Sequence, residues 1–298
     1  MAHEQWPHTL ELTETDRIFL LAPHPDDEVL GAGGLLARAR QAGLPVLVAF
    51  LTNGDGSRTM RISENVRKPG RYLNRDDAFI KLARVRQLEA LAAADKLGVA
   101  ASDVVFLGYP DGGTHIMWEK HWQPDRPFRS RHTRCERSPY ANSHTPNAIY
   151  CGEHALEDVR KTIEKFRPTL VLTTHPADSH ADHLTAFNAC ALALEHLRTA
   201  STEGAWAHAC RLLSFLIHFG PWPVPAGYRP QLSLVPPAGL NGLGTHWLTT
   251  QLSESERETK KAALEQYRSQ LATTPRYLRS FVRRNELFSE ISLSVRSD

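Results

Sequence analysis

A short apolar run at residues 17–22 ends directly in a cluster of ionisable side chains between His24 and Glu28. The run has the length of a buried strand, and residues 29–42 continue as an apolar-periodic helix. Open α/β sheets are built from such strand–helix units, and they carry their binding groups beyond the carboxyl ends of the strands. The pattern therefore predicts an α/β fold with a functional site after this strand.

The first cluster has two interpretations. Three adjacent carboxylates, Asp26, Asp27 and Glu28, repel one another unless a cation or a proton lies among them, which favours a metal site. Alternatively, the aspartates accept the free N–H groups at the start of the helix, and Glu28 favours its first turn. Helix capping does not require His24, so the histidine favours the metal site.

A second cluster follows the apolar run at residues 169–174. It contains three histidines within nine residues, beginning at His175, and the helical pattern resumes at Asp182 or His183. His180 and His183 are three residues apart, so they converge on one point if the turn is helical. A capped helix with solvated imidazoles is the alternative. Two such clusters at the ends of neighbouring strands favour a shared metal site.

The residue types in both clusters narrow the choice of metal. Imidazole and carboxylate without cysteine suit Zn²⁺, with Fe²⁺, Mn²⁺ and Co²⁺ as chemically compatible substitutes. Three protein ligands and one position open to water form the catalytic arrangement. The cysteines lack the paired spacing of a zinc ribbon or a disulfide framework and are expected to be ordinary thiols: Cys135, Cys151, Cys190 and Cys210.

The two clusters resemble the zinc-dependent de-N-acetylases of the LmbE-like or PIG-L family, which includes deacetylases of N-acetylglucosaminyl-phosphatidylinositol and of mycothiol and bacillithiol synthesis. The matching motifs are A-P-H-P-D-D-E at residues 22–28 and H-A-D-H at residues 180–183. Supporting similarity lies at residues 86–89, 107–112, 260–270 and 281–288. The resemblance implies a three-layer α/β/α, Rossmann-like domain with a mainly parallel sheet and one zinc ion.

The resemblance also implies a role for each ionisable group. Asp26 would be the general base that takes a proton from the attacking water. His180 would stabilise the oxyanion in its protonated form and help to protonate the leaving amine, with Asp182 orienting it. The implied zinc ligands are His24, Asp27 and His183.

Four further residues are candidates for substrate binding. Arg86 lies beside a helix face formed by Val85, Leu88 and Ala92, and a solvated arginine is the alternative to the substrate contact that the resemblance implies. The other three follow expected strands. Turn formation is the first interpretation of these residues, and a place in the pocket is the second. They are Asn53, Asp55 and Asp111.

The length of 298 residues and a hydrophobic content of 41% suit one α/β domain spanning residues 1–298. The formal net charge of +2 gives no broad positive electrostatic field that would attract nucleic acid, so no nucleic-acid partner is expected. No apolar run reaches the ~20 residues needed to cross a bilayer, and residues 1–16 lack the apolar core of a signal peptide. These features predict a cytoplasmic protein without a transmembrane segment; a homo-oligomer remains compatible with them.

Two irregular stretches of the sequence fall outside the motifs that resemble the family. Residues 115–152 are rich in arginine, tryptophan and proline without helical or strand period, and they are expected to form either an active-site lid or an oligomer contact. Aromatic rings there would stack on sugars and arginines would pair with phosphate. Residues 220–244, rich in proline and glycine, are expected to form a second pocket wall or an extended connection.

Together these features predict a hydrolase that removes the acetyl group from an N-acetylglucosamine-type sugar or glycoconjugate and releases acetate and a free amine. An amidase for a larger acyl group or a thiol–sugar conjugate is one alternative. A phosphoesterase with two metal ions is another. A carbohydrate-binding module without catalysis is the third, although binding alone requires neither Asp26 nor His180.

Overall fold

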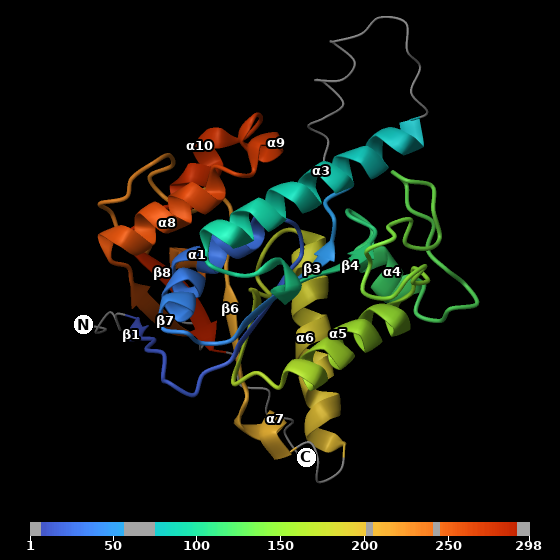
Figure 1. Cartoon of the computed structure of the whole chain (residues 1–298), viewed down its shortest axis with the longest axis horizontal. Coiled ribbons are helices and arrows are strands. Elements are labelled where there is room, and N and C mark those ends of the chain that lie inside the picture. The colour runs from blue at the N-terminus through green and yellow to red at the C-terminus, as the bar shows by residue number, and fades with distance from the viewer. Residues whose placement is uncertain (1–6, 57–74, 201–204, 241–244, 291–298) are drawn as a thin grey trace, which may run out of the picture.

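The computed structural model describes residues 7–56, 75–200, 205–240 and 245–290. Within these residues eight strands form one sheet in the order β1-β7-β8-β6-β5-β2-β3-β4 (Figure 1). Strands from both ends of the sequence therefore share this sheet. The strands are β1 (His8–Thr9), β2 (Ile18–Ala22), β3 (Val46–Thr52), β4 (Val104–Tyr109), β5 (Leu170–Thr174), β6 (Arg211–Phe215), β7 (His246–Gln251) and β8 (Asn285–Glu290).

The sheet is mostly parallel. Strand β2 pairs parallel with both β3 and β5, and β8 is antiparallel to its neighbours β6 and β7. Every residue of β2 and β5 is buried. Strands covered on both faces read as continuous apolar runs, which is why the runs at residues 17–22 and 169–174 predicted them. The expected α/β class with a mainly parallel sheet is confirmed.

Helices cover both faces of the sheet (Figure 1). Leu20 of β2 packs in one apolar cluster, whereas Phe19 and Leu21 pack in the other, because successive strand residues point to opposite faces. The helices of the first cluster are α1 (Asp27–Gln41), α3 (Arg75–Lys96) and α8 (Glu254–Leu264). Those of the second are α4 (Thr114–Lys120), α5 (Gly152–Phe166), α6 (Ala181–Thr199) and α7 (Ala205–Ala209). Short helices α9 (Arg268–Leu271) and α10 (Pro275–Leu278) follow α8. None of the helices described is long and apolar enough to span a membrane.

Helix α3 is oriented differently from the sequence expectation. Val85 and Leu88 are 39% and 68% exposed, so the face that contains them is not the core face. Leu82, Arg86 and Ala90 are buried instead. The periodicity of apolar residues did not distinguish the two faces, because α3 carries apolar residues on more than one face. Arg86 is consequently turned inward, towards the ends of the strands.

The two irregular stretches differ from their predictions. The segment 115–152 was expected to lack helical structure, but its start lies in α4, and Trp118 packs edge-on against Trp122 with ring centroids 5.0 Å apart. Both tryptophans are partly buried and pack against the second apolar cluster. In the stretch 220–240, Trp222 is buried and its Nε1 donates to the Val235 carbonyl at 2.9 Å. Residues 241–244 lie outside the described residues.

A buried ion pair ties α8 to α1 and β8. Lys260 Nζ donates to Glu286 Oε1 at 2.7 Å and to the Leu30 carbonyl at 2.9 Å. The Glu286 carboxylate also accepts the N–H groups of Gly34 and Leu35. Lys260 and Glu286 are both fully buried, so each charge depends on the other.

We expect Lys260→Met to lower the free energy of unfolding by about 3–5 kcal/mol, since it leaves the Glu286 carboxylate buried without its cation. Urea denaturation measures the loss. The neighbouring Lys261 pairs with Glu258 on the surface, so Lys261→Met is the matched control and should change stability little. Equal stabilities of the two variants would contradict the structural role of Lys260.

Candidate functional site

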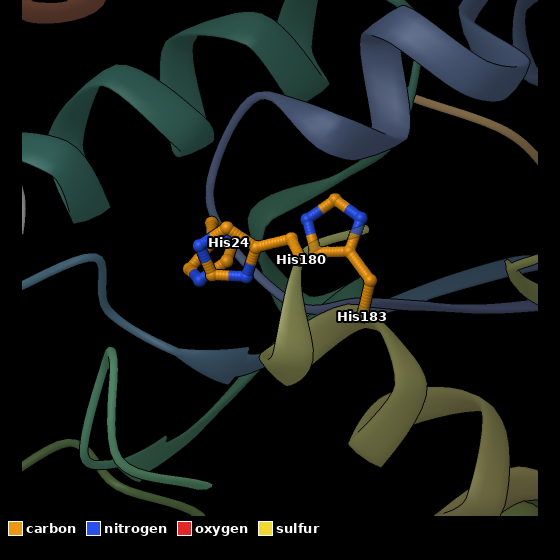
Figure 2. Close-up of side chains that lie close together, drawn as sticks. All are labelled: His24, His180 and His183. Atoms are coloured by element: carbon orange, nitrogen blue, oxygen red, sulfur yellow. The ribbon is translucent and has the colours of Figure 1, made fainter. Parts of the chain in front are cut away.

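Polar side chains converge at the carboxyl ends of the parallel strands. The turn between β2 and α1 carries His24. His180 is the N-cap residue of α6, which follows β5, and His183 lies in the first turn of that helix. Because β2 and β5 are neighbours in the sheet, the three imidazoles come together, with the His24 ring centroid 4.8 Å from that of His180 and 5.3 Å from that of His183 (Figure 2). The structure thus joins the two sequence clusters in one site.

Asp27 lies between two of these histidines. Its Oδ2 atom is 3.2 Å from His24 Nδ1 and 3.2 Å from His183 Nε2. All three side chains are buried. One carboxylate and two imidazole nitrogens facing a common point form a three-ligand set of the kind that holds a catalytic metal.

The far nitrogen of each imidazole faces a different carboxylate. His24 Nε2 is 3.2 Å from Asp182 Oδ2 and 3.3 Å from Asp111 Oδ1, and His183 Nδ1 is 3.0 Å from Asp178 Oδ2. Carboxylates in these positions retain the proton on the far nitrogen and leave the lone pair on the nitrogen beside Asp27. Neither buried nitrogen of His183 meets hydrogen-bond geometry with a protein group. The donor set therefore fits a divalent cation.

The electrostatics point the same way. Burial alone would lower the pKa of His183, but the charges of Asp27 and Asp178 raise it to about 9. Burial would raise the pKa of Asp27, whereas the charge and hydrogen bonds of His183 and His24 hold it well below its usual range. Ionised carboxylates attract positive charge to these nitrogens, and the same attraction favours a metal cation.

Asp26 immediately precedes α1 but does not cap it, since its side chain accepts no hydrogen bond from the helix. The capping interpretation is therefore wrong for this residue. Its carboxylate lines the pocket, with Oδ1 3.4 Å from Arg86 Nη2, and Arg86 also donates to the Pro25 carbonyl at 2.6 Å. Burial raises the pKa of Asp26 to about 7 against the opposing charge of Arg86. A carboxylate with a pKa near neutrality suits a general base.

The carboxylate of Asp182 does not contact His180, contrary to the orienting role that the resemblance implied. It accepts the N–H groups of Gly112 and Thr114 and the Thr114 hydroxyl, and it faces His24. Both carboxylate oxygens of Asp182 thus accept hydrogen bonds from the turn between β4 and α4. The link to His180 is the Asp182 backbone N–H, which donates to His180 Nδ1 at 3.3 Å.

The surroundings of His180 favour its neutral form. Burial, together with the charges of His24 and His183, lowers its pKa to about 4. The low pKa favours a neutral ring over the protonated His180 that the resemblance implied. Because Nδ1 accepts a backbone N–H, the ring proton lies on Nε2. His180 can thus donate one hydrogen bond without carrying a charge.

The predicted substrate-binding residues divide into two pairs. Arg86 and Asp111 line the pocket, and at 3% exposure Arg86 is not the solvated arginine of the alternative interpretation. Asn53 and Asp55 are fully buried and do not line the pocket, so the structure does not support their substrate contacts. Asp55 contacts the segment 115–152, where the Tyr140 hydroxyl donates to its Oδ2 at 2.6 Å.

The burial of Asp55 predicts a pH dependence of stability. Burial, with the negative charge of Asp111, raises its pKa from 3.8 to about 7. The folded state thus favours the neutral carboxyl, and this contribution is complete below about pH 4 and lost as the pH rises through about 7. We expect the stability of the wild type relative to Asp55→Asn to fall by up to about 4 kcal/mol over this range. Denaturation at a series of pH values measures the difference; a constant difference would contradict the raised pKa.

The site opens into a pocket of about 630 Å³. The segment 115–152 reaches its rim through Arg131 and His132, whereas no residue of 220–240 lines it. The segment around α9 and α10 also lines the pocket, and the described part of residues 220–244 does not form the pocket wall that was one of its two expectations. The lining residues are His24, Asp26, Asp27, Leu30, Gly56, Arg86, Asp111, Gly112, Arg131, His132, His180, His218, Gln270, Thr274, Tyr277 and Leu278.

The sequence analysis missed His218 and its partner Tyr277. The Tyr277 hydroxyl donates to the Ile217 carbonyl at 2.7 Å, so its oxygen accepts from His218 Nδ1 at 3.1 Å and leaves the lone pair on Nε2. A ring nitrogen of His218 lies within 4.8 Å of the ligand atoms of Asp27 and His183. His218 follows the apolar run of β6, so the rule that found the other two clusters could have found it. Tyr277 has no such local signal.

Asp178 was also missed, although it lies within the second sequence cluster. Besides facing His183, its carboxylate accepts the N–H groups of His180, Ile217 and His218. It therefore joins the turn after β5 to the segment after β6. No spacing in the sequence indicates which acid of the cluster has this role.

Comparison with known proteins decides the family. Residues 19–194, more than half of the chain, match the sequence family described as PIG-L, GlcNAc-PI de-N-acetylase. The chain belongs to the PIG-L family. Both clusters lie inside the matched region, whereas the α9–α10 wall of the pocket lies outside it.

Two curated PIG-L relatives are named as 1D-myo-inositol 2-acetamido-2-deoxy-alpha-D-glucopyranoside deacetylases. The one from Saccharopolyspora erythraea is 31% identical over 186 residues, covering 59% of this chain and 53% of the relative. The one from Kineococcus radiotolerans is 27% identical over 199 residues, covering 65% of this chain and 49% of the relative. The chain thus spans about half the length of these relatives.

Solved structures share the fold over nearly the whole chain. A conserved protein of Thermus thermophilus has a TM-score of 0.53 at 22% identity, with 94% of this chain and 97% of that chain covered. The N,N'-diacetylchitobiose deacetylase of Pyrococcus horikoshii gives 0.54 at 17% identity, with 93% and 84% covered. The zinc-inhibited form of a teicoplanin deacetylase gives 0.56 at 21% identity, with 94% and 100% covered. The three-layer PIG-L fold therefore extends beyond the region matched in sequence.

Proposed function

We propose that this protein is a metal-dependent deacetylase that hydrolyses the acetamide of an N-acetylglucosamine-type sugar or glycoconjugate. The observation that carries the proposal is the position of Asp26, beside the proposed metal ligands around Asp27. Its carboxylate does not cap α1, lines the pocket and has a pKa raised to about 7. Membership of the PIG-L family and the names of the curated relatives support the substrate class.

We propose Zn²⁺ as the metal, one ion per chain, held by His24, Asp27 and His183. The set of one carboxylate and two imidazoles without thiolate suits zinc, and Fe²⁺, Mn²⁺ or Co²⁺ fit the same donors. A bound divalent cation would supply Lewis-acid polarisation of the substrate carbonyl and of water. Asp178 and Asp182 would hold His183 and His24 in the required tautomers.

The protein groups divide the proton transfers between them. The Asp26 carboxylate takes a proton from the attacking water as the water oxygen bonds to the amide carbon. His180 Nε2–H donates to the carbonyl oxygen while negative charge develops there, a task for which a neutral ring suffices. When the C–N bond breaks, the amine nitrogen receives the proton held on Asp26, so acetate and a free amine are the products.

We expect His180→Ala to lower kcat by about 10²–10³-fold while the protein keeps its metal, because the variant loses an oxyanion donor and no proposed ligand. Acetate release and metal content measured on the same sample test this. The matched control is His121→Ala, since His121 lies in the segment 115–152 and does not line the pocket. Loss of the metal in step with activity would make His180 a ligand instead.

The remaining elements fit one catalytic domain with a sugar-sized pocket. We propose that residues 1–298 form one domain, supported by the shared sheet of β1 and β8. Gln270 and Thr274 bring side-chain hydrogen-bonding groups to the wall opposite Arg131, as recognition of sugar hydroxyls requires. The segment 115–152 would act as the rim that contacts the remainder of a glycoconjugate.

The function is tested by acetate release from zinc-reconstituted protein. The substrates are N-acetylglucosamine, its myo-inositol glycoside and N,N'-diacetylchitobiose, each compared with an analogue that carries a longer acyl group. Release of acetate with one metal ion per chain supports the proposal. Preference for the longer acyl group would indicate the wider amidase, and phosphate release from a phosphate ester with two metal ions per chain would indicate a phosphoesterase.

A further inference from the structure

The backbone at Asp26 is strained. Its φ of 129° and ψ of −30° lie in a region that residues with a Cβ atom rarely occupy. Such a conformation costs on the order of 1–3 kcal/mol and persists only where its surroundings impose it. The contacts of the Asp26 backbone therefore determine whether its carboxylate stays directed into the pocket.

Glu28 restrains this backbone through the N–H group of Asp26. Its Oε2 accepts the Asp26 N–H at 3.0 Å, and its Oε1 accepts the hydroxyl of Tyr267. Glu28 is 2% exposed and Tyr267 is fully buried, and neither lines the pocket. Both oxygens of the carboxylate are thus used to connect Asp26 to Tyr267.

Tyr267 belongs to a distant part of the chain. It lies 239 residues after Glu28, in the connection between α8 and α9, and outside the region matched to the family. Burial among aromatic and aliphatic side chains of the first apolar cluster leaves its ring little freedom. The Tyr267 hydroxyl is therefore a fixed point against which the Glu28 carboxylate is held.

A role for Glu28 in helix stability alone does not account for its second contact, with the Tyr267 hydroxyl. An acidic residue in the first turn favours a helix through its dipole, and it can also accept the backbone N–H of the N-cap residue, as in a capping box. The N–H that Glu28 accepts belongs to Asp26, which precedes the helix. The bond therefore constrains the backbone of the residue that carries the base, as well as the start of α1.

We propose that Glu28 and Tyr267 are positioning residues that hold the Asp26 backbone at positive φ and so direct its carboxylate into the pocket. Arg86 restrains the same turn from the other side through the Pro25 carbonyl. Without Glu28 the Asp26 backbone relaxes to an ordinary conformation and the carboxylate moves. A displacement of about 1 Å at a catalytic group lowers the rate by about a hundredfold.

The kinetic part of the test rests on the proposed deacetylase function. Glu28→Ala should lower kcat by about a hundredfold and Tyr267→Phe by about tenfold, with KM and metal content unchanged. Glu28→Gln should stay within about threefold of the wild type, because its amide oxygen accepts the Asp26 N–H and its amide N–H donates to the Tyr267 oxygen. If Tyr267 acts only through Glu28, the double variant Glu28→Ala, Tyr267→Phe should equal Glu28→Ala.

The matched control removes a chemically equivalent bond elsewhere. The Tyr109 hydroxyl donates to Asp158 at 2.8 Å, both residues are buried, and neither lines the pocket. Tyr109→Phe therefore reports the general cost of losing a buried tyrosine–carboxylate bond. A kcat for Tyr267→Phe equal to that for Tyr109→Phe would overturn the positioning role.

Crystal structures of wild type and Glu28→Ala give a readout independent of turnover. The expected result is positive φ at Asp26 in the wild type and negative φ in Glu28→Ala, with Asp27 in place in both. An unchanged positive φ in Glu28→Ala would overturn the inference even if the enzyme is active. An inactive wild type in which Glu28→Ala still releases the backbone would count against the proposed function alone.

Discussion

Asp26→Asn is expected to lower kcat for acetate release by about 10²–10⁴-fold while leaving one metal ion per chain. Asparagine has nearly the same shape as aspartate but cannot take a proton from water, so the general-base contribution is lost. The proposed metal ligands are untouched, because Asp26 is not one of the three side chains that meet at Asp27 Oδ2. Steady-state kinetics and mass-spectrometric metal analysis of the same preparation provide the two measurements.

The control for this variant is Asp125→Asn. Asp125 is an exposed aspartate in the segment 115–152 and does not line the pocket, so its replacement should leave kcat unchanged. An Asp26→Asn protein with near wild-type turnover would show that another group deprotonates water. His218 would then be the first candidate, because its Nε2 carries a lone pair at the edge of the same pocket.

The second large effect is expected on metal affinity. Asp27→Ala and His183→Ala should each weaken binding of Zn²⁺ by more than about a hundredfold, since even groups that only orient metal ligands change affinity about 10–100-fold. Asp27 should be the more sensitive position, because its Oδ2 atom lies 3.2 Å from both ligand histidines. Competition with a chromophoric chelator measures the affinity, and the thermal stabilisation by added zinc should disappear in parallel.

Two further variants calibrate this experiment. Asp178→Asn keeps the shape of the residue that faces His183 Nδ1, and it should weaken zinc binding by about 10–100-fold. His208→Ala removes an exposed histidine on α7 and should have no effect. Wild-type zinc affinity in His183→Ala would rule out the proposed ligand set and leave the cluster of His24, Asp111 and Asp182 as the other place for a cation.

The strands and the two ionisable clusters were predictable because their signals are local. An apolar run such as β5 identifies a strand covered on both faces, and the polar residues that follow it must lie at the edge of the sheet. Short-range sterics and burial determine these features within a few residues. The sequence was also sufficient to bring His24 and His183 to one site, because parallel strands end at the same edge.

Helix α3 shows where this local information ends. Its sequence offers apolar residues on more than one face, and only packing against the rest of the molecule decided that Arg86 points inward and Leu88 outward. The burial of Asp55 was decided in the same way, by the segment that contributes Tyr140. Periodicity reports which residues can be buried, but contacts between distant segments select among them.

The sequence by itself determined the fold class, the family and the carboxylate–imidazole chemistry, because a motif fixes the identity and spacing of neighbouring groups. The tertiary structure alone decided the partners of those groups. It turned the Asp182 carboxylate towards His24, placed His218 beside the cluster, and joined Glu28 to Tyr267 across 239 residues. Hydrogen bonds of a few ångströms between segments far apart in sequence depend on the whole packing arrangement, which no local spacing encodes.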